Sequence, residues 1–107
     1  MAYFLLQGAY TAEVWKTLVE NPANRVEAVR PAIEKLGGRV ESAFFAFGDY
    51  DVVALVELPD NKAAAALALG IGASGALSKY RTTVLMTQDE AMESMRRAGD
   101  ISYIPPQ

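Results

Sequence analysis

The sequence predicts an α+β fold, in which a four-stranded antiparallel sheet carries its two main helices on one face and is followed by a C-terminal helix and tail. Three observations support this prediction. Strand-like and helix-like segments alternate in a β, α, β, β, α, β order, a short polar interval joins the middle strands, and 107 residues with 51% hydrophobic side chains suffice for one core. We therefore expect a single domain over 1–107, with its core at about 3–87 and a C-terminal segment over 88–107.

The N-terminal third is expected to form a strand and two helices. Residues 3–10 are rich in aromatic and aliphatic side chains and end at Thr11, a residue type that caps helices. Asn21 and Pro22 then resemble the N-cap and the first residue of a second helix. Pro31 lies inside that helix and predicts a kink or a break, because proline lacks the backbone N–H and crowds the preceding turn.

The middle of the chain is expected to form a hairpin. Residues 39–47 and 52–58 are strand-like runs, and the four residues Gly48-Asp49-Tyr50-Asp51 separate them. An interval of this length and polarity closes antiparallel hairpins, so the second and third strands should be neighbours.

The last third is expected to supply a helix, a strand and a final helix. An alanine-rich helix over 62–69 should end at the glycines of 70–75, followed by a strand over 79–87 and a helix over 88–97. The tail, 100–107, is too apolar for a simple solvated end. This order of elements is the ferredoxin-like pattern, in which two right-handed βαβ crossovers interleave.

Charge and composition exclude several classes of function. Ten Lys and Arg against thirteen Asp and Glu give a net charge of −3, and no basic run could follow a phosphate backbone, so we expect no nucleic acid partner. The absence of Cys and His excludes disulfides, thiolate zinc sites and catalysis that depends on histidine. We expect no cofactor and no metal. The N-terminus resembles neither a signal peptide nor a membrane span, which favours a cytoplasmic location without a membrane partner.

The sequence Gly-Ile-Gly-Ala-Ser-Gly over 70–75 matches the G-x-G-x-x-G pattern of dinucleotide sites. In those sites the motif follows a strand and opens a helix, whereas here it follows a helix and precedes a strand. We interpret it as a flexible connector, with an anion-binding nest as the alternative.

Six residues are candidates for a ligand site, four in the hairpin loop and two aromatic residues before it: Gly48, Asp49, Tyr50, Asp51, Tyr10 and Trp15. The aspartates could share a proton or hold a cation, but two carboxylates are too few for a metal, and a turn with backbone hydrogen bonds is the alternative. Tyr50 could serve as a general acid or cover a pocket, or it could pack on another subunit. Trp15 lies on an apolar helical stripe, which favours a core or interface role. Gly48 is expected to matter most in the loop if its φ is positive.

Four cationic side chains that are scattered along the sequence could bind an anionic ligand: Arg30, Arg39, Lys79 and Arg81. The simpler interpretation is that they are solvated or ion-paired on the surface.

Both faces of the middle strands are apolar, which indicates that something covers the second face of the sheet. The strand 52–58 reads Val-Val-Ala-Leu-Val-Glu-Leu, and Phe44 and Phe45 point to opposite faces of the strand before it. A second copy of the chain is the favoured cover, since large apolar patches mark interfaces. The alternative is that the C-terminal helix and tail fold back.

The chain resembles a GYD domain at Gly48, Tyr50 and Asp51, with an apolar strand after them, Leu36-Gly37-Gly38 before them and an alanine-rich helix ending in glycine further on. The resemblance implies a small ferredoxin-like domain, similar to the dimeric α/β-barrel proteins, with no established activity or cofactor. We expect a homo-oligomeric, non-enzymatic module that binds a small molecule or a protein partner. The alternative is a cofactor-independent oxygenase or isomerase of the small α/β-barrel type, in which Tyr and Asp side chains handle a proton.

Overall fold

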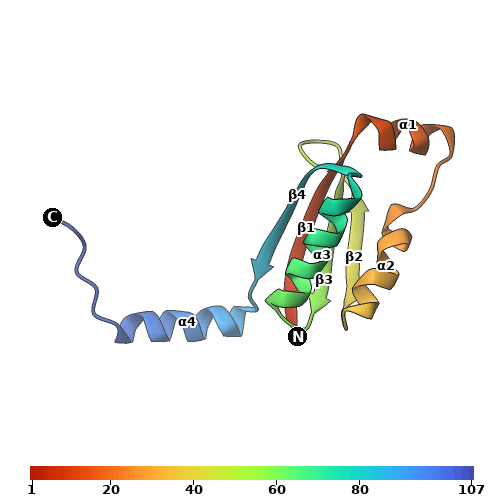
Figure 1. Cartoon of the computed structure of the whole chain (residues 1–107). Coiled ribbons are helices and arrows are strands. Elements are labelled where there is room, and N and C mark those ends of the chain that lie inside the picture. Colours follow the sequence, from red (N-terminus) through yellow and green to blue (C-terminus); the bar gives the residue numbers. More distant parts are fainter.

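The computed structural model describes residues 1–107 and has the ferredoxin-like α+β arrangement (Figure 1). The four strands form one antiparallel sheet in the order β2-β3-β1-β4, so the predicted hairpin is confirmed as the β2/β3 pair. None of the four helices has the length and apolar character needed to span a membrane. The elements, in chain order, are β1 (Ala2–Tyr10), α1 (Ala12–Glu20), α2 (Arg25–Lys35), β2 (Arg39–Phe45), β3 (Val52–Leu58), α3 (Asn61–Ser74), β4 (Leu77–Leu85) and α4 (Gln88–Asp100).

The core lies between the sheet and helices α2 and α3. Phe4 pairs with Val56 across β1 and β3, and both side chains are fully buried on the face that these helices cover. Ile33 of α2 and Leu67 of α3 pack onto them. The alanines of α3 let its backbone approach the sheet closely, which is how an alanine-rich segment serves as a core helix.

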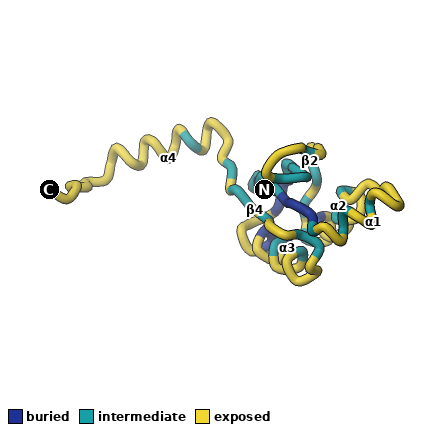
Figure 2. Tube along the Cα trace, turned by 90° about the horizontal axis from the view of Figure 1, so that it is seen from above, coloured by how far each residue is buried: buried dark blue, intermediate teal, exposed yellow.

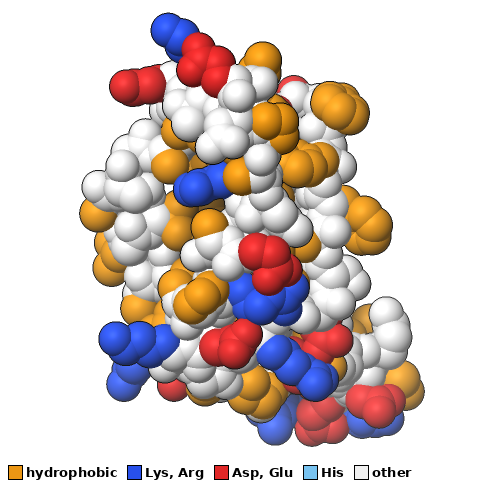
Figure 3. Space-filling model, turned by 90° about the vertical axis from the view of Figure 1, so that its right-hand side faces the viewer, with side chains coloured by type: hydrophobic (Ala, Val, Ile, Leu, Met, Phe, Trp, Pro, Cys, Tyr) orange, Lys and Arg blue, Asp and Glu red, His pale blue; other side chains and the backbone are white.

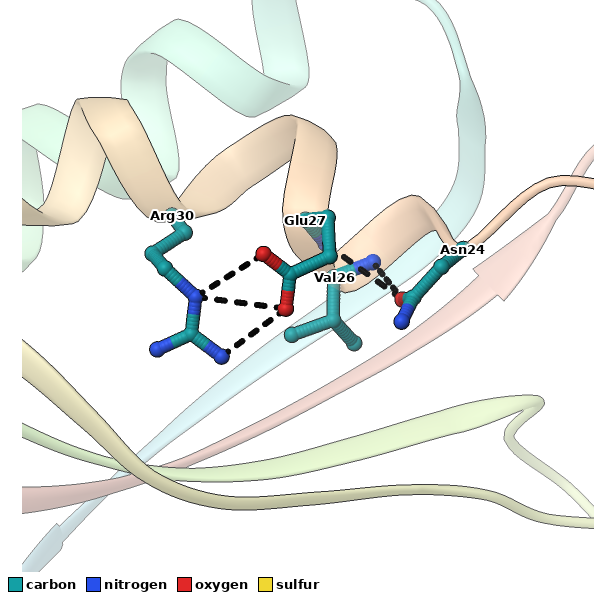
Figure 4. A network of polar contacts seen from close by, with 4 residues as sticks. All are labelled: Asn24, Val26, Glu27 and Arg30. Atoms are coloured by element: carbon teal, nitrogen blue, oxygen red, sulfur yellow. Dashed lines mark hydrogen bonds and ion pairs between the residues drawn. The ribbon is translucent and has the colours of Figure 1, made fainter.

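Side chains cap the starts of the helices, and one start differs from the prediction. Thr11 caps α1 as expected, with its hydroxyl accepting from the Val14 N–H. Helix α2, however, begins at Arg25 rather than at Pro22, because Asn24 is the residue whose side chain accepts the free N–H groups of Val26 and Glu27 (Figure 4). The sequence offers two asparagines three positions apart, and the second one is the N-cap.

Two further expectations about helices are met only in part: the break considered at Pro31 is absent, and the glycines of 70–75 end α3 later than expected. Pro31 does not break α2, which continues as one helix to Lys35. Gly70 and Gly72 do not end α3, which runs to Ser74 and stops at Gly75 in the left-handed conformation with φ 73°. The G-x-G-x-x-G segment is therefore mostly the last turns of a helix, not a flexible connector. Glycine is tolerated there because the helix already packs through its alanine and leucine face.

The C-terminal arm, which we define as residues 88–107, does not fold back onto the body. Helix α4 and the tail project away from the sheet, on the side opposite α3 (Figures 1 and 2). Every residue of the arm is exposed except Ala91, which is half-buried. The arm extends the molecule to 58 Å along its longest axis.

The face of the sheet away from α2 and α3, here called the open face, is uncovered by this chain. Its centre is apolar, since Leu5 of β1 pairs with Leu55 of β3 and both side chains point to this face. Val53 and Phe44 continue the apolar surface toward β2. The sequence-based inference that both sheet faces are apolar therefore agrees with the side-chain alternation in the structure.

Candidate functional site

Asp51 joins three parts of the chain at one end of the sheet. Its Oδ2 atom accepts a hydrogen bond from the backbone N–H of Tyr10 at 2.9 Å and another from the indole Nε1 of Trp15 at 3.2 Å. Its own backbone N–H donates to the carbonyl of Gly8 at 2.8 Å. The hairpin loop is thereby fixed to the end of β1 and to α1. Of the six candidate residues, the structure brings these three together: Tyr10, Trp15 and Asp51.

The aromatic rings around Asp51 pack against one another. Trp15 meets Tyr10 edge to face, with ring centroids 5.5 Å apart and planes at 87°, and its ring lies 6.4 Å from that of Phe45. This edge-to-face geometry is the favoured one for aromatic pairs and contributes about 1 kcal/mol beyond the burial of area. The position of the Tyr10 side chain is therefore set by Trp15 and by the backbone hydrogen bond to Asp51.

The other loop residues lie apart from this group. Tyr50 is half-buried, and the ammonium of Lys79 on β4 lies over its ring at 5.0 Å from the centroid. Gly48 and Asp49 are exposed. Gly48 does not have the positive φ on which its expected importance depended, since only Gly37 and Gly75 have positive φ, and a Cβ at Gly48 would meet no atom within 4 Å. The loop is long enough to turn without a left-handed residue.

A partly open cavity of about 140 Å³ lies between the sheet and helices α2 and α3. Gly8 forms part of its wall, and a Cβ at that position would lie only 3.0 Å from Leu77 Cδ1. A cavity of this volume accommodates a molecule about the size of benzene. Most of the lining side chains are apolar, among them Leu6, Val26, Val29, Val52, Ala54, Ile71 and Leu77.

Five polar residues also line this cavity: Gln7, Ser74, Tyr10, Arg25 and Tyr80. The Ser74 hydroxyl already donates a hydrogen bond to the Ile71 carbonyl. Burial is the main cause that raises the pKa of Tyr10; the nearby Arg25 guanidinium opposes the increase and the Asp51 carboxylate adds to it. Burial likewise raises the pKa of Tyr80, with a smaller opposing effect from the Thr82 hydroxyl. Both phenols therefore remain protonated at neutral pH and are available as hydrogen-bond donors.

The polar groups at the cavity are incompletely satisfied. The Tyr80 and Thr82 hydroxyls are buried close to each other, and neither has a hydrogen-bond partner elsewhere in the chain. Arg25 forms no ion pair with any carboxylate. Burying hydroxyls with so few possible partners is costly in an ordinary core.

The other cations are engaged or lie elsewhere. Arg30 holds Glu27 through two nitrogens, with a shortest distance of 3.0 Å (Figure 4). Arg39 binds the nearly buried Glu57 at 2.6 Å and Glu41 at 2.7 Å. The surface-charge interpretation of these two arginines is therefore confirmed, while Arg25, which sequence analysis did not single out, is the cation beside the cavity.

The arrangement is better suited to binding than to acid–base chemistry at the loop. Asp51 Oδ2 is occupied by two fixed donors, and Asp49 is exposed. No group of three or more acidic, histidine or cysteine side chains is placed to hold a metal. What the cavity offers is an apolar volume with two phenol donors and one guanidinium, a donor set for a carboxylate or another acceptor.

Comparisons with known proteins agree with this fold. A family model described as the GYD domain matches residues 4–95. A solved structure described as FFRP-DM1 has a TM-score of 0.50 and 18% sequence identity to this chain, and the match covers 80% of this chain and 100% of that chain. The structure of TTHA0845 from Thermus thermophilus has a TM-score of 0.52 and 23% identity, covering 81% and 95% of the two chains. No curated protein sequence matches the chain. The two structural similarities concern the fold alone.

Proposed function

The chain belongs to the GYD domain family, and we propose that it binds a small, mostly apolar molecule with one carboxylate in the cavity between its sheet and helices α2 and α3. The single observation behind this proposal is that Tyr10, Tyr80 and Arg25, which forms no ion pair, meet at a mostly apolar cavity. In this proposal Tyr10, Tyr80 and Arg25 touch the ligand. Asp51 and Trp15 act as positioning residues for Tyr10.

The residues that line the cavity determine which ligand would fit it. A ring or a branched aliphatic group fills the part formed by Val29, Ile71 and Leu77. The carboxylate then lies toward Arg25, whose exposed position in the first turn of α2 places it at the rim. A hydrogen bond to a charged group contributes about 1.5–3 kcal/mol, more than a bond between neutral groups, so a carboxylate should be preferred over an alcohol of the same shape.

The experiment is a calorimetric titration with benzoate and with benzyl alcohol as the neutral counterpart. Arg25→Gln should weaken benzoate binding about tenfold or more and leave the binding of benzyl alcohol almost unchanged. Arg30→Gln is the matched control, because Arg30 lies on the same helix, pairs with Glu27 and does not line the cavity. Equal affinity of the wild type for both compounds, or equal effects of the two arginine variants, would contradict the proposal.

A second part of the proposed function is self-association through the open face. Leu5 and Leu55 form the centre of an apolar surface that no other part of the chain covers. Stacking two open faces would bury it in a sheet-on-sheet contact about 10 Å thick.

Sedimentation tests this part directly. At micromolar concentration the protein should sediment as a dimer or a larger species, and Leu55→Gln should increase the monomer fraction. Leu69→Gln, on the exposed outer side of α3, is the matched control and should have no effect. A wild-type protein that sediments as a monomer would contradict self-association and leave the cavity proposal standing.

A further inference from the structure

The C-terminal arm presents an apolar stripe that its own body does not cover. Ala91, Met92, Met95 and Ala98 fall on one side of α4, and the charged residues lie on the other. Met92 and Met95 are 48% and 70% exposed, and the tail adds Ile101, Tyr103 and Ile104, all exposed. A helix of 13 residues with no packing partner is marginally stable in water, even with the Thr87 and Glu90 capping box that α4 has. We therefore expect the apolar stripe of α4 to pack against another surface.

A second exposed apolar surface lies at the opposite edge of the sheet, along β2. Phe44 and Phe45 are 70% and 52% exposed, and Phe47 just beyond the strand is fully exposed. A groove of about 700 Å³ runs beside them, between β2 and the start of α2, with Val26 and Val40 in its wall. On the side of the molecule seen in Figure 3, hydrophobic side chains emerge between charged side chains of both signs.

The arm and the β2 edge of the same chain are badly placed to meet. Strands β3 and β1 separate β2 from β4, which makes β2 and β4 the two edges of the sheet, about 14 Å apart at 4.8 Å per strand. Helix α4 begins three residues after β4 ends and leads away from the body, on the open-face side (Figure 2). An occupant from another molecule suits the groove better than the chain's own arm.

We propose that the C-terminal arm of one copy docks on the β2 edge of a second copy, in the groove beside Phe44 and Phe45. This inference rests on the self-association part of the proposed function. When two open faces stack about a two-fold axis parallel to the strands, each β4 lies over the partner's β2, so each arm starts beside the groove it would fill. The arm also leaves its own sheet on the open-face side, which is the side where the partner would lie.

The dimensions agree with this arrangement. Helix α4 has 13 residues and is about 20 Å long at 1.5 Å per residue, and seven residues follow it. Stacked sheets lie about 10 Å apart, so the arm is long enough to pass from its own sheet to the edge and the helix side of the partner's sheet. Its methionines suit an aromatic groove, because thioether sulfur packs favourably against ring edges. The contact occurs twice in a two-fold dimer, which doubles the apolar area that the arms cover.

The absence of cysteine allows a direct test with single-cysteine variants of the full chain. Met95→Cys, on the arm stripe, is mixed with Ser42→Cys, an exposed β2 residue in the groove wall, and treated with a short bismaleimide. The mixed cross-linked product is expected. Lys62→Cys, exposed at the start of α3, replaces Ser42→Cys in the control mixture and should give at least fivefold less product.

A second pair of variants measures how much the arm contributes. Met92→Gln with Met95→Gln should raise the dimer dissociation constant about tenfold or more, because the double variant no longer buries two methionine side chains in the groove. Glu93→Gln with Arg97→Gln, on the charged side of α4, conserves the net charge and removes only the exposed ion pairs of Glu93 with Arg96 and Arg97, so it should change the constant less than twofold.

The outcomes separate the two proposals. A dimeric protein with no preference for the Ser42 cross-link, and with no effect of the methionine variants, overturns arm docking and leaves self-association intact. A monomeric wild type overturns both. A cross-link formed within single chains of a Met95→Cys/Ser42→Cys variant at high dilution shows that the arm folds back on its own body, which also overturns the proposal.

Discussion

Trp15 and Asp51 are 36 positions apart in the sequence, yet the indole N–H of Trp15 donates a hydrogen bond of 3.2 Å to the Asp51 carboxylate. The same carboxylate oxygen accepts the Tyr10 backbone N–H at 2.9 Å. The aspartate of the Gly48, Tyr50 and Asp51 motif thus closes the end of the sheet beside the cavity. Its observed contacts are those of a residue that holds Tyr10 in place.

Asp51→Ala should therefore destabilise the protein much more than Asp49→Ala. The first variant leaves two donors without an acceptor in a partly buried site and should lower the free energy of unfolding by about 1–3 kcal/mol. Asp49 is exposed and makes no side-chain hydrogen bond, so its variant should stay within about 0.5 kcal/mol of the wild type. Urea denaturation of both variants measures the difference. Equal stabilities would show that the contacts of Asp51 are energetically unimportant.

Tyr80→Phe should leave the unliganded protein as stable as the wild type or make it more stable. Removing a buried tyrosine hydroxyl that is hydrogen-bonded usually costs about 1 kcal/mol, but the Tyr80 hydroxyl has no partner other than the neighbouring Thr82 hydroxyl. Thermal melts without ligand and with saturating benzoate check both halves of the prediction. Benzoate should raise the melting temperature of the wild type more than that of the variant; a clear loss of stability without ligand would mean that the hydroxyl is satisfied in solution.

Gly38→Ala should be far more destabilising than Gly48→Ala. A Cβ at Gly38 would overlap the carbonyl oxygen of Glu57 and lie 2.6 Å from Leu58 Cδ2, so the start of β2 would have to move away from β3. Overpacking of this kind costs about 1–3 kcal/mol. Gly48 has neither a positive φ nor a neighbour within 4 Å of an added Cβ. Melting temperatures of the two variants provide the comparison, and a larger loss at Gly48 would contradict the described loop.

Acid should remove the contribution of Glu57 to stability. The hydrogen bond from Arg39 is the main cause that lowers the pKa of Glu57 below its ordinary value of 4.5. Folding therefore favours the ionised carboxylate, so its contribution is complete above about pH 4.5 and is lost as the pH falls through the lower pKa of the folded state. The difference in unfolding free energy between the wild type and Glu57→Gln should shrink between pH 6 and pH 3.

The matched control for this acid titration is Glu20→Gln, at the exposed end of α1. Its difference from the wild type should remain small across the same pH range. A difference for Glu57→Gln that stays constant on acidification would mean that the Arg39 pair does not depend on the charge of the carboxylate.

The element order and the β2/β3 hairpin could be predicted because their signals are local. Thr11 caps the helix that follows it, and a polar loop separates two apolar runs, so each element can be inferred from a few neighbouring residues. The first residue of α2 and the last residue of α3 could not be predicted in this way. Asn21 and Asn24 are equally suitable caps by type, and the glycines of α3 are tolerated because packing elsewhere on the helix outweighs their propensity.

The site was only partly predictable, for a different reason. Tyr10, Trp15 and Asp51 were candidates by residue type, and the structure brings them together. Arg25 and Tyr80 were missed, because their place beside the cavity depends on long-range register. Tyr80 lies opposite Gly8 across β1 and β4, where the missing side chain of the glycine leaves room. No pattern within one segment reveals that pairing.

The most direct test of the central claim is a two-dimensional ¹H–¹⁵N NMR titration of the labelled protein with benzoate. We predict that the shift changes concentrate on residues that line the cavity, including Gly8, Val29, Ile71 and Tyr80, and that Arg25→Gln abolishes them at the same benzoate concentration. Changes confined to exposed cations such as Arg96 and Arg97, or to the loop at Gly48 and Asp49, would contradict binding in the cavity.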